Sequence, residues 1–462
     1  MKSTAYKFVL FPVMLVTLQS CFTAKNYISP QVVGESHYRT DQLPEDSLTI
    51  AEISWQELFT DEQLKSHIEE GLANNIDIRM ALQQIEMADA YFRQGKSALY
   101  PHLDLNGQTI HQQLSDNGPS GGGDITQYEL TGTLSWQADI WGNIRSSRRA
   151  SEASYLQSVA AHKAVKTELI ANIASVYFQL LAFDEQRKIT EQSITNREQN
   201  LETTRALKDA GYVTEVGVKQ TEAQLYSAIS LLIDIKSNIK LLENTMSILL
   251  GDGPHAIERS HLDQQVITNE LHTGFPVQLL RNRPDVIAAE YNLISAFELT
   301  NVARSDFYPS LSLSATGGLR SLELDNVLSL NSLFSNVIGS LTQPVFNGRR
   351  LRTQLEVAQS QEEMAYLNFK RAILNGSREV SDAMYSFEAA DDKIEVESQQ
   401  YEAYEIATRY SEELLENGLI NYLEVITARE NALNAQLSLI NSRYDRLNSI
   451  VELYKALGGG WQ

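Results

Sequence analysis

Two kinds of hydrophobic periodicity alternate along the chain, one typical of strands and the other of helices. The strand pattern, in which apolar and polar residues alternate, occurs in two pairs of segments, at about 102–115, 126–140, 310–324 and 333–346. The helical pattern, with apolar residues spaced by three and four, covers about 143–209 and 349–416. These patterns predict a mainly α-helical chain that also carries two β-hairpins.

Proline and glycine residues mark where the predicted helices end. The helix before each hairpin stops at a Tyr-Pro pair, Tyr100-Pro101 or Tyr308-Pro309, because proline disfavours helical continuation. Each long helix ends in a glycine turn, and a return helix then runs to a second glycine. The glycines of the turns are Gly211 and Gly418, and those after the return helices are Gly251 and Gly458.

The chain contains an internal duplication. Residues 60–251 and 272–458 follow the same order of helix, hairpin, long helix, tip turn and return helix, with an offset of roughly 207 residues. A linker at 252–271, predicted as an equatorial segment, joins the two repeats. Residues 21–59 precede the first repeat as an anchor and belt segment, and 459–462 form a C-terminal tail.

The predicted elements need partners. A helix of about 65 residues is roughly 100 Å long, so other helices must stabilise it laterally. Four strands are too few for a closed membrane barrel, which needs about eight or more, and a bilayer tolerates no open sheet edge. The strands are therefore expected to be shared in a cyclic oligomer of two, three or four copies.

The first twenty residues resemble a secretion signal. Lys2 and Lys7 precede an apolar stretch, Phe8–Leu18, that is too short to span a bilayer. Leu18-Gln19-Ser20-Cys21 then resembles a lipobox, in which the peptide is cut before a cysteine that becomes acylated, and this cysteine is the only one in the chain. We therefore predict a signal peptide at 1–20 and a mature N-terminus at Cys21, which acyl chains such as palmitate hold at the membrane.

The composition excludes several function classes. Of 462 residues, 59 are acidic and 38 are basic, and the resulting net charge of -21 disfavours binding to nucleic acid. The acidic surplus fits either a solvated surface or an acidic lumen that favours cations. The scattered histidines show no metal-site spacing, and we find no phosphate-binding glycine loop or catalytic motif. No cofactor, bound metal or enzymatic activity is therefore expected.

This arrangement resembles the TolC family of outer-membrane channels, most closely the lipoprotein branch that serves resistance-nodulation-division efflux systems. The resemblance covers nearly all of the mature chain. It rests on the lipobox, the hairpin entries, the segments after each hairpin and the tip turns, namely Cys21, Tyr100-Pro101, Tyr308-Pro309, Trp136–Gly142, Gln343–Gly348, Ala210–Thr214 and Asn417–Val425.

The resemblance implies a homotrimer with a twelve-stranded β-barrel, four strands from each chain, and a long α-helical barrel in the periplasm. It implies a passive duct of a tripartite efflux pump, lipid-anchored in the outer membrane and extending into the periplasm. The implied partners are a periplasmic adaptor (membrane fusion) protein, an inner-membrane resistance-nodulation-division transporter and outer-membrane lipid. Catalysis is not implied, because the transporter supplies the energy.

Two groups of site residues follow from the resemblance. The tip turns, where adaptor hairpins engage in the family, correspond here to Gly211, Tyr212, Val213, Gly418, Leu419 and Ile420. The family often places acidic residues just beyond the tips, around a closed aperture, and Glu424 matches one such gate position. Thr427 and Gly217 occupy two further positions that are often acidic, so a gate of several acidic layers is not expected. Glu424 is equally explained as an acid that favours the start of a helix.

Two other functions share parts of this pattern. A type I secretion channel uses the same fold, although such channels usually lack the lipid anchor that Cys21 indicates. A structural envelope lipoprotein would tether the membrane without conducting. Efflux of small molecules remains the leading prediction, and no Met-rich or His-rich tract points to copper or silver as the cargo.

Overall fold

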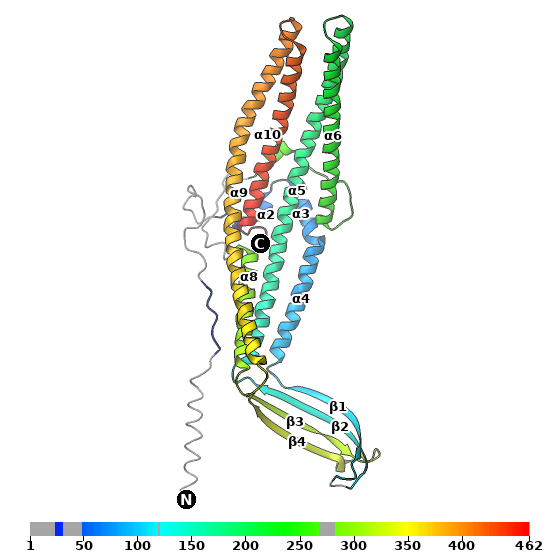
Figure 1. The fold of residues 1–462 in the computed structure, drawn as a ribbon, viewed down its shortest axis with the longest axis vertical. Coiled ribbons are helices and arrows are strands. Elements are labelled where there is room, and N and C mark those ends of the chain that lie inside the picture. Colours follow the sequence, from blue (N-terminus) through cyan, green and yellow to red (C-terminus); the bar gives the residue numbers. More distant parts are fainter. Residues whose placement is uncertain (1–23, 31–48, 119–120, 268–281, 462) are drawn as a thin grey trace. The chain divides into compact units, whose positions relative to one another are not determined.

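The computed structural model describes residues 24–30, 49–118, 121–267 and 282–461 (Figure 1). The predicted signal peptide and the predicted lipid site at Cys21 lie outside the described residues.

Helices make up most of the described chain, and the longest two have 67 residues each. Each pairs with its return helix, so that Figure 1 shows one hairpin of α5 with α6 and another of α9 with α10. The helices are η2 (Ile50–Glu52), α2 (Trp55–Leu58), α3 (Glu62–Asn74), α4 (Ile76–Ser97), α5 (Asn143–Asp209), α6 (Glu215–Leu250), η3 (Leu262–Gln264), α8 (Pro284–Ser305), η5 (Leu330–Ser332), α9 (Arg350–Glu416) and α10 (Tyr422–Ala456). None of the described helices combines the length and the apolar character needed to cross a membrane.

The segment predicted as one helix before the first hairpin is two helices, α3 and α4. Asn75 separates them, because its N–H bonds to the Gly71 carbonyl at the end of α3 while its Oδ1 accepts hydrogen bonds from the Asp77 and Ile78 amides that open α4. Asparagine is a favoured residue at such a helix start. The pattern did not reveal the break because the buried positions keep helical spacing across it.

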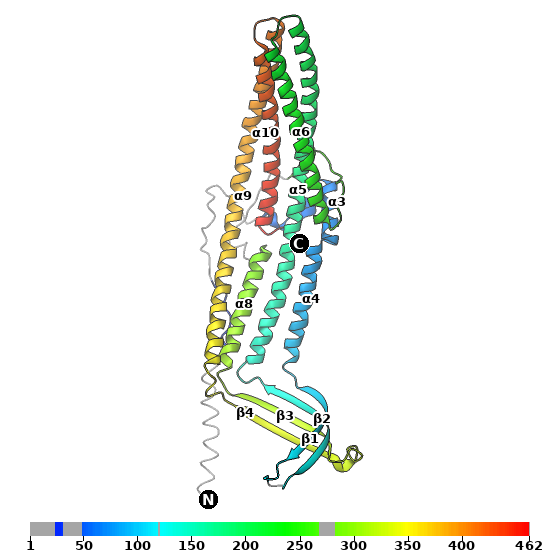
Figure 2. The same ribbon diagram turned by 45° about the vertical axis from the view of Figure 1, so that its right-hand side comes forward.

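The two predicted hairpins pair with each other and form one antiparallel sheet, in the order β1-β2-β3-β4 (Figure 2). The strands are β1 (His102–Leu114), β2 (Gly123–Ala138), β3 (Ser310–Ser321) and β4 (Leu333–Thr342). Because β2 pairs with β3, the joint between the two repeats lies in the middle of the sheet. β1 and β4 are the outer strands, and each pairs with one described strand.

The register gives the sheet one apolar face and one polar face. A row across the apolar face consists of Leu103, Leu134, Ala315 and Val337. One residue along each strand, a row on the opposite face consists of Asp104, Thr133, Thr316 and Asn336. The exposed side chains of the apolar face include Leu105, Leu130, Leu313, Leu333 and Leu341. An exposed apolar surface of this kind is typical of contact with lipid or with another apolar surface.

The duplication is preserved in the fold. α9 begins 207 residues after α5, and α8 begins 208 residues after α4. Gly251 and Gly458 follow the two return helices with left-handed φ angles of 83° and 86°. The equivalent residues Asn75 and Arg283 each donate a side-chain hydrogen bond, of 2.9 and 2.8 Å, to a carbonyl near the end of the return helix of their own repeat. In both repeats, the residue just before α4 or α8 is therefore bonded to the end of the return helix in the same way.

The described chain divides into two compact units, and each unit contains segments from both repeats. Among the described residues, one unit comprises 24–30, 85–158 and 289–369, including the sheet, and the other comprises 49–84, 159–288 and 370–461. Each repeat contributes to both units, because its long helix, α5 or α9, has residues in both. The main hydrophobic core lies in the second unit, where Tyr177 and Phe178 of α5 are among the largest fully buried side chains.

Candidate functional site

The two hairpin tips have the same backbone turn. The glycines that follow the long helices, Gly211 and Gly418, have left-handed φ angles of 84° and 70°. The next residues, Tyr212 and Leu419, each donate a backbone hydrogen bond of 2.9 Å to the carbonyl five residues earlier. This is the hydrogen bond of a Schellman cap, whose left-handed residue is glycine because glycine adopts that conformation without strain.

Each tip carries one exposed apolar side chain on this rigid turn. Tyr212 and Leu419 occupy equivalent positions and are both exposed, whereas the residues after them, Val213 and Ile420, are half-buried. Val213 lies against the following helix, since a Cβ added at Gly217 would lie 2.6 Å from its Cγ1. The tips therefore present small apolar surfaces with a fixed backbone, as protein-binding loops often do.

The charges at the two tips differ. At the first tip Lys208 pairs with Glu215 at 3.0 Å, and this contact raises the pKa of Lys208 and lowers that of Glu215. At the second tip Glu424 lies exposed in the first turn of α10, where its carboxylate has no hydrogen bond or ion pair with any described residue. The start of α10 is capped by Asn421, whose Oδ1 accepts a hydrogen bond of 3.1 Å from the Leu423 amide. The Glu424 carboxylate is therefore not used as that cap.

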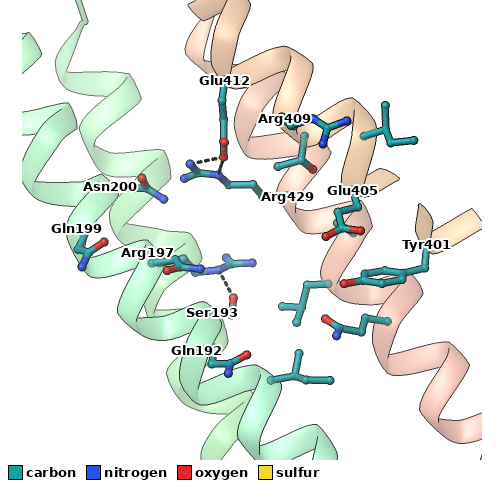
Figure 3. Close-up of a pocket in the computed structure, with 17 residues that line it drawn as sticks. Gln192, Ser193, Arg197, Gln199, Asn200, Tyr401, Glu405, Arg409, Glu412 and Arg429 are labelled. Carbon is teal, nitrogen blue, oxygen red and sulfur yellow. Dashed lines mark hydrogen bonds and ion pairs between the residues drawn. The ribbon is translucent and has the colours of Figure 1, made fainter. Parts of the chain in front are cut away.

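A polar groove of about 670 Å³ lies among α5, α9 and α10 (Figure 3). The residues labelled there are Gln192, Ser193, Arg197, Gln199 and Asn200 of α5, Tyr401, Glu405, Arg409 and Glu412 of α9, and Arg429 of α10. Arg429 donates a hydrogen bond of 2.8 Å to Glu412 and thereby ties α10 to α9. A lining of amides, acids and bases suits water and charged groups better than an apolar ligand.

Arg197 joins the two helical hairpins at this groove. Its nearly buried guanidinium donates hydrogen bonds to the Gln224 carbonyl on α6 and to Glu430 on α10, each of 2.9 Å. This role of Arg197 was not predicted from the sequence. The available signal was an arginine between Ile194 and Leu201, at a position where helical spacing predicts an apolar side chain.

A segment at 252–267, here called the linker strap, is part of the second unit and is held in place there by polar contacts. Asp61 accepts hydrogen bonds from Tyr177 Oη at 2.7 Å and from Gln265 Nε2 at 2.8 Å, and Ser260 also donates to it. Burial alone would raise the pKa of Asp61, but these hydrogen bonds outweigh burial and lower it. Their contribution to stability is present above the ordinary carboxyl pKa and is lost as the pH falls through the lowered value.

The residues that follow the predicted lipid site lie along α8. Asn301 donates a hydrogen bond of 3.1 Å to the Lys25 carbonyl, and Ser29 donates one of 2.6 Å to Glu290. The segment 24–30 therefore runs antiparallel to α8, with its first residues near the end of the helix that leads into β3.

A solved structure shares this fold over nearly the whole chain. The solved structure of the open MtrE outer membrane channel of Neisseria gonorrhoeae matches with a TM-score of 0.85 and 25% identity, covering 96% of this chain and 99% of that one. The sequence profile of the family described as "Outer membrane efflux protein" matches residues 67–252 and 275–459. The chain belongs to this family, which confirms the resemblance to TolC-like channels.

Two relatives match the chain over nearly its whole length. The solvent efflux pump outer membrane protein SrpC of Pseudomonas putida is 27% identical, over 98% of this chain and 99% of that protein. The cation efflux system protein CusC of Escherichia coli O6:H1 is 28% identical, over 97% of each chain. The protein is therefore the outer-membrane component of an efflux system and a member of a channel family. The predicted function and its location in the outer membrane are confirmed.

Proposed function

We propose that three copies of this chain form one duct that carries small solutes from the periplasm, or from an inner-membrane transporter, to the exterior. The observation that supports this proposal most strongly is the sheet, which has one apolar and one polar face. Among the described residues, its outer strands β1 and β4 are each paired along one edge only. Lipid does not tolerate unpaired backbone groups, so neighbouring copies must supply the missing partners. The apolar face would then meet lipid and the polar face would surround an aqueous path.

Exposed apolar residues on the helices support such an assembly. On α9 they include Val357, Met364, Leu367, Leu374, Tyr385 and Val396, and on α6 they include Tyr226, Ile233, Leu241 and Ile248. Helices of this length need lateral partners, and these residues are suited to that contact. The stoichiometry of three rests on the resemblance to TolC-like channels.

The tips are assigned to adaptor docking. Gly211, Tyr212 and Val213 form one docking turn, and Gly418, Leu419 and Ile420 form the equivalent turn of the second repeat. Their matching caps and exposed apolar side chains support this assignment. The adaptor is a periplasmic membrane fusion protein, and an inner-membrane resistance-nodulation-division transporter supplies the energy. Relatives named for solvents and for cations match equally well, so the cargo class is small solutes.

A lipid on Cys21 would lie near the ends of the strands. Ala24 lies beside the loop between β2 and α5, since a Cβ added at Gly142 would be 3.8 Å from the Ala24 Cβ. Cys21 precedes Ala24 by three residues, which span at most about 11 Å when fully extended. An acyl chain there would reach the same membrane surface that the sheet enters.

The lipid anchor is tested at the mature N-terminus. Mass spectrometry of the purified protein should show acylated Cys21 and no residues 1–20. The substitution Cys21→Ser should abolish acylation, whereas the assembled protein should stay in washed membranes, because the sheet still enters the bilayer. An unmodified mature chain that begins elsewhere would remove the lipid anchor and leave the duct untouched.

The duct and its gate are tested by conductance in planar bilayers. The reconstituted protein should conduct, and millimolar divalent cations on the periplasmic side should block the current, because three Glu424 carboxylates near one axis attract them. Glu424→Ala should relieve the block without changing assembly. Glu416→Ala, at an exposed acid at the end of α9, serves as the matched control and should remain blocked.

Each outcome of the conductance experiment has a distinct meaning. A stable protein that inserts but never conducts would contradict the duct and favour a structural lipoprotein. If Glu424→Ala conducts and is blocked as strongly as the parent, then Glu424 only favours the start of α10, and other side chains form the constriction.

A further inference from the structure

The loop between β3 and β4 exposes a group of leucine side chains. Residues 322–332, here called the leucine loop, lie at the end of the sheet opposite to α8 and α9 (Figure 2). Four of the leucines are 63–89% exposed, namely Leu322, Leu324, Leu328 and Leu330. In the equivalent loop between β1 and β2, the described residues 115–118 and 121–122 are serine, aspartate, asparagine and glycine. The shape of the hairpin therefore does not require these leucines.

The polar groups of the leucine loop bond to one another. Ser332, which is 8% exposed, donates a hydrogen bond of 2.7 Å to the Asn326 carbonyl, and the Asn326 side-chain amide donates one to Glu323. The Ser329 and Ser332 amides donate bonds of 3.0 and 3.1 Å to the carbonyls three residues before them. The loop thus has an ordered backbone and presents its leucines outward, as a contact surface does.

The leucine loop continues the apolar face of the sheet. The last pair of β3 and β4 is Leu319 with Leu333, and both lie on the same face as Ala315 and Val337, because side chains four residues apart on a strand share a face. Leu333 is 68% exposed and directly follows the loop. Apolar side chains therefore continue from that face into the loop.

The length of the strands places the leucine loop at the outer surface of the bilayer. β3 has 12 residues and β4 has 10, and a tilted strand of about 9–11 residues crosses a membrane. The helices leave the sheet at one end, so the loop at the other end emerges where acyl chains meet the outer headgroups. Leucines at that boundary leave water if the loop lies against the acyl chains.

We propose that the leucine loop is a membrane contact, which sets its leucine side chains among the acyl chains of the outer leaflet. Glu323 and Asp325 remain at the headgroups, in contact with water. The occupant of this surface is lipid, because the loop continues the face that meets lipid in the proposed duct. The inference rests on the proposed function, since it needs the sheet to lie in a bilayer. In an assembled duct, these loops form a collar that fixes the depth of the sheet.

Fluorescence quenching tests the lipid contact. Leu330→Cys is labelled with an environment-sensitive dye and reconstituted in vesicles of phosphatidylcholine and phosphatidylglycerol. Lipids spin-labelled near the headgroup should quench this dye, and iodide in the water should not, because the leucine side chain lies below the headgroups. The parent protein, treated with the same dye, gives the background from Cys21.

Two further labelled positions serve as controls. Asn117→Cys, in the polar loop between β1 and β2, should be quenched by iodide and should show about threefold weaker quenching by lipid than Leu330→Cys. Val337→Cys, on the apolar face of the sheet, should be quenched by lipids spin-labelled deeper in the acyl chain.

The outcomes separate this inference from the duct. Iodide quenching of Leu330→Cys as strong as that of Asn117→Cys would place the loop in water and overturn the inference. Shielding of Leu330→Cys from both quenchers would also overturn it, because another copy or another protein would then cover the loop. In either case, lipid quenching at Val337→Cys leaves the proposed duct standing. Loss of quenching at Val337→Cys would contradict the insertion of the sheet itself.

A second experiment removes leucines and leaves the dye in place. With the dye at Leu324→Cys, the substitutions Leu328→Ser and Leu330→Ser should together lower the quenching by lipid about threefold, because less apolar surface holds the loop at the membrane. Both side chains are exposed, so the fold and the conductance should match the parent. Asn331→Ser, at an exposed polar position of the same loop, should leave the quenching unchanged. Undiminished quenching in the double serine variant would mean that the dye inserts without the leucines, and the inference would be wrong.

Discussion

Replacing Gly318 by alanine is expected to force strands β2 and β3 apart. A Cβ at this position would lie 2.1 Å from the Leu130 carbonyl oxygen and 2.7 Å from the Thr131 Cα, both backbone atoms of the neighbouring strand. No side-chain rotation relieves such a contact, so we expect a loss of about 3 kcal/mol, the upper end of the usual overpacking cost. The protein should reach the outer membrane in reduced amount and unfold at lower temperature, as followed by tryptophan fluorescence.

The adjacent glycine provides the control for this experiment. A Cβ at Gly317 would meet only the Phe334 carbonyl oxygen, at an ordinary contact distance of 3.7 Å. Gly317→Ala should therefore unfold within about 1 kcal/mol of the parent, since both substitutions reduce the entropy of the unfolded chain equally. Equal effects of the two variants would contradict the close approach of β2 and β3.

Replacing Arg283 by alanine is expected to cost about 2–4 kcal/mol, because it removes the ion pairs at the junction of α8, α9 and α10. The buried guanidinium contacts Asp285 and Glu379, each at 2.7 Å, and donates a hydrogen bond of 2.8 Å to the Ala456 carbonyl. The two acids are partly exposed and regain water in the variant, so the loss falls below that of a fully buried pair. Urea unfolding measures the change.

Two comparisons separate charge from geometry at this junction. Arg283→Lys keeps the charge but cannot bind both acids and the carbonyl at once, so it should recover only part of the loss. Asn75→Ala removes the equivalent helix contact in the first repeat and should cost less, about 1–2 kcal/mol. If Arg283→Ala costs no more than Asn75→Ala, the ion pairs do not stabilise the junction.

The sequence predicted the long helices closely because their signals are local and repeated. Heptad-like spacing fixes the body of each helix, and glycine fixes its end, so the predicted range 143–209 coincides with α5 and 349–416 differs from α9 by one residue. The predicted ends of the strands differ from the observed ends by up to about four residues, because a strand ends where its pairing ends and pairing is not a local signal. The order of the strands was not predicted, because nothing local states that β2 lies beside β3.

The candidate site could be predicted in part, for the same reason. The tip turns have a local signature, a glycine after a long apolar-periodic helix, and the structure places a left-handed glycine at both positions. Arg197 was missed because its role depends on Gln224 and Glu430, which come from two other helices. Side chains that act through contacts between distant segments leave little trace in the pattern of one segment.

The two outer strands have a consequence for the life of the chain before it assembles. In the proposed assembly, a newly exported copy presents β1 and β4 as the outer strands of its sheet, and strand pairing between copies does not by itself stop at a ring. Until the ring closes, linear polymerisation competes with it, and the outcome depends on how many copies meet and how fast. Slow, dilute delivery to the membrane should favour closed channels, whereas overproduction should favour insoluble polymers of correctly folded chains.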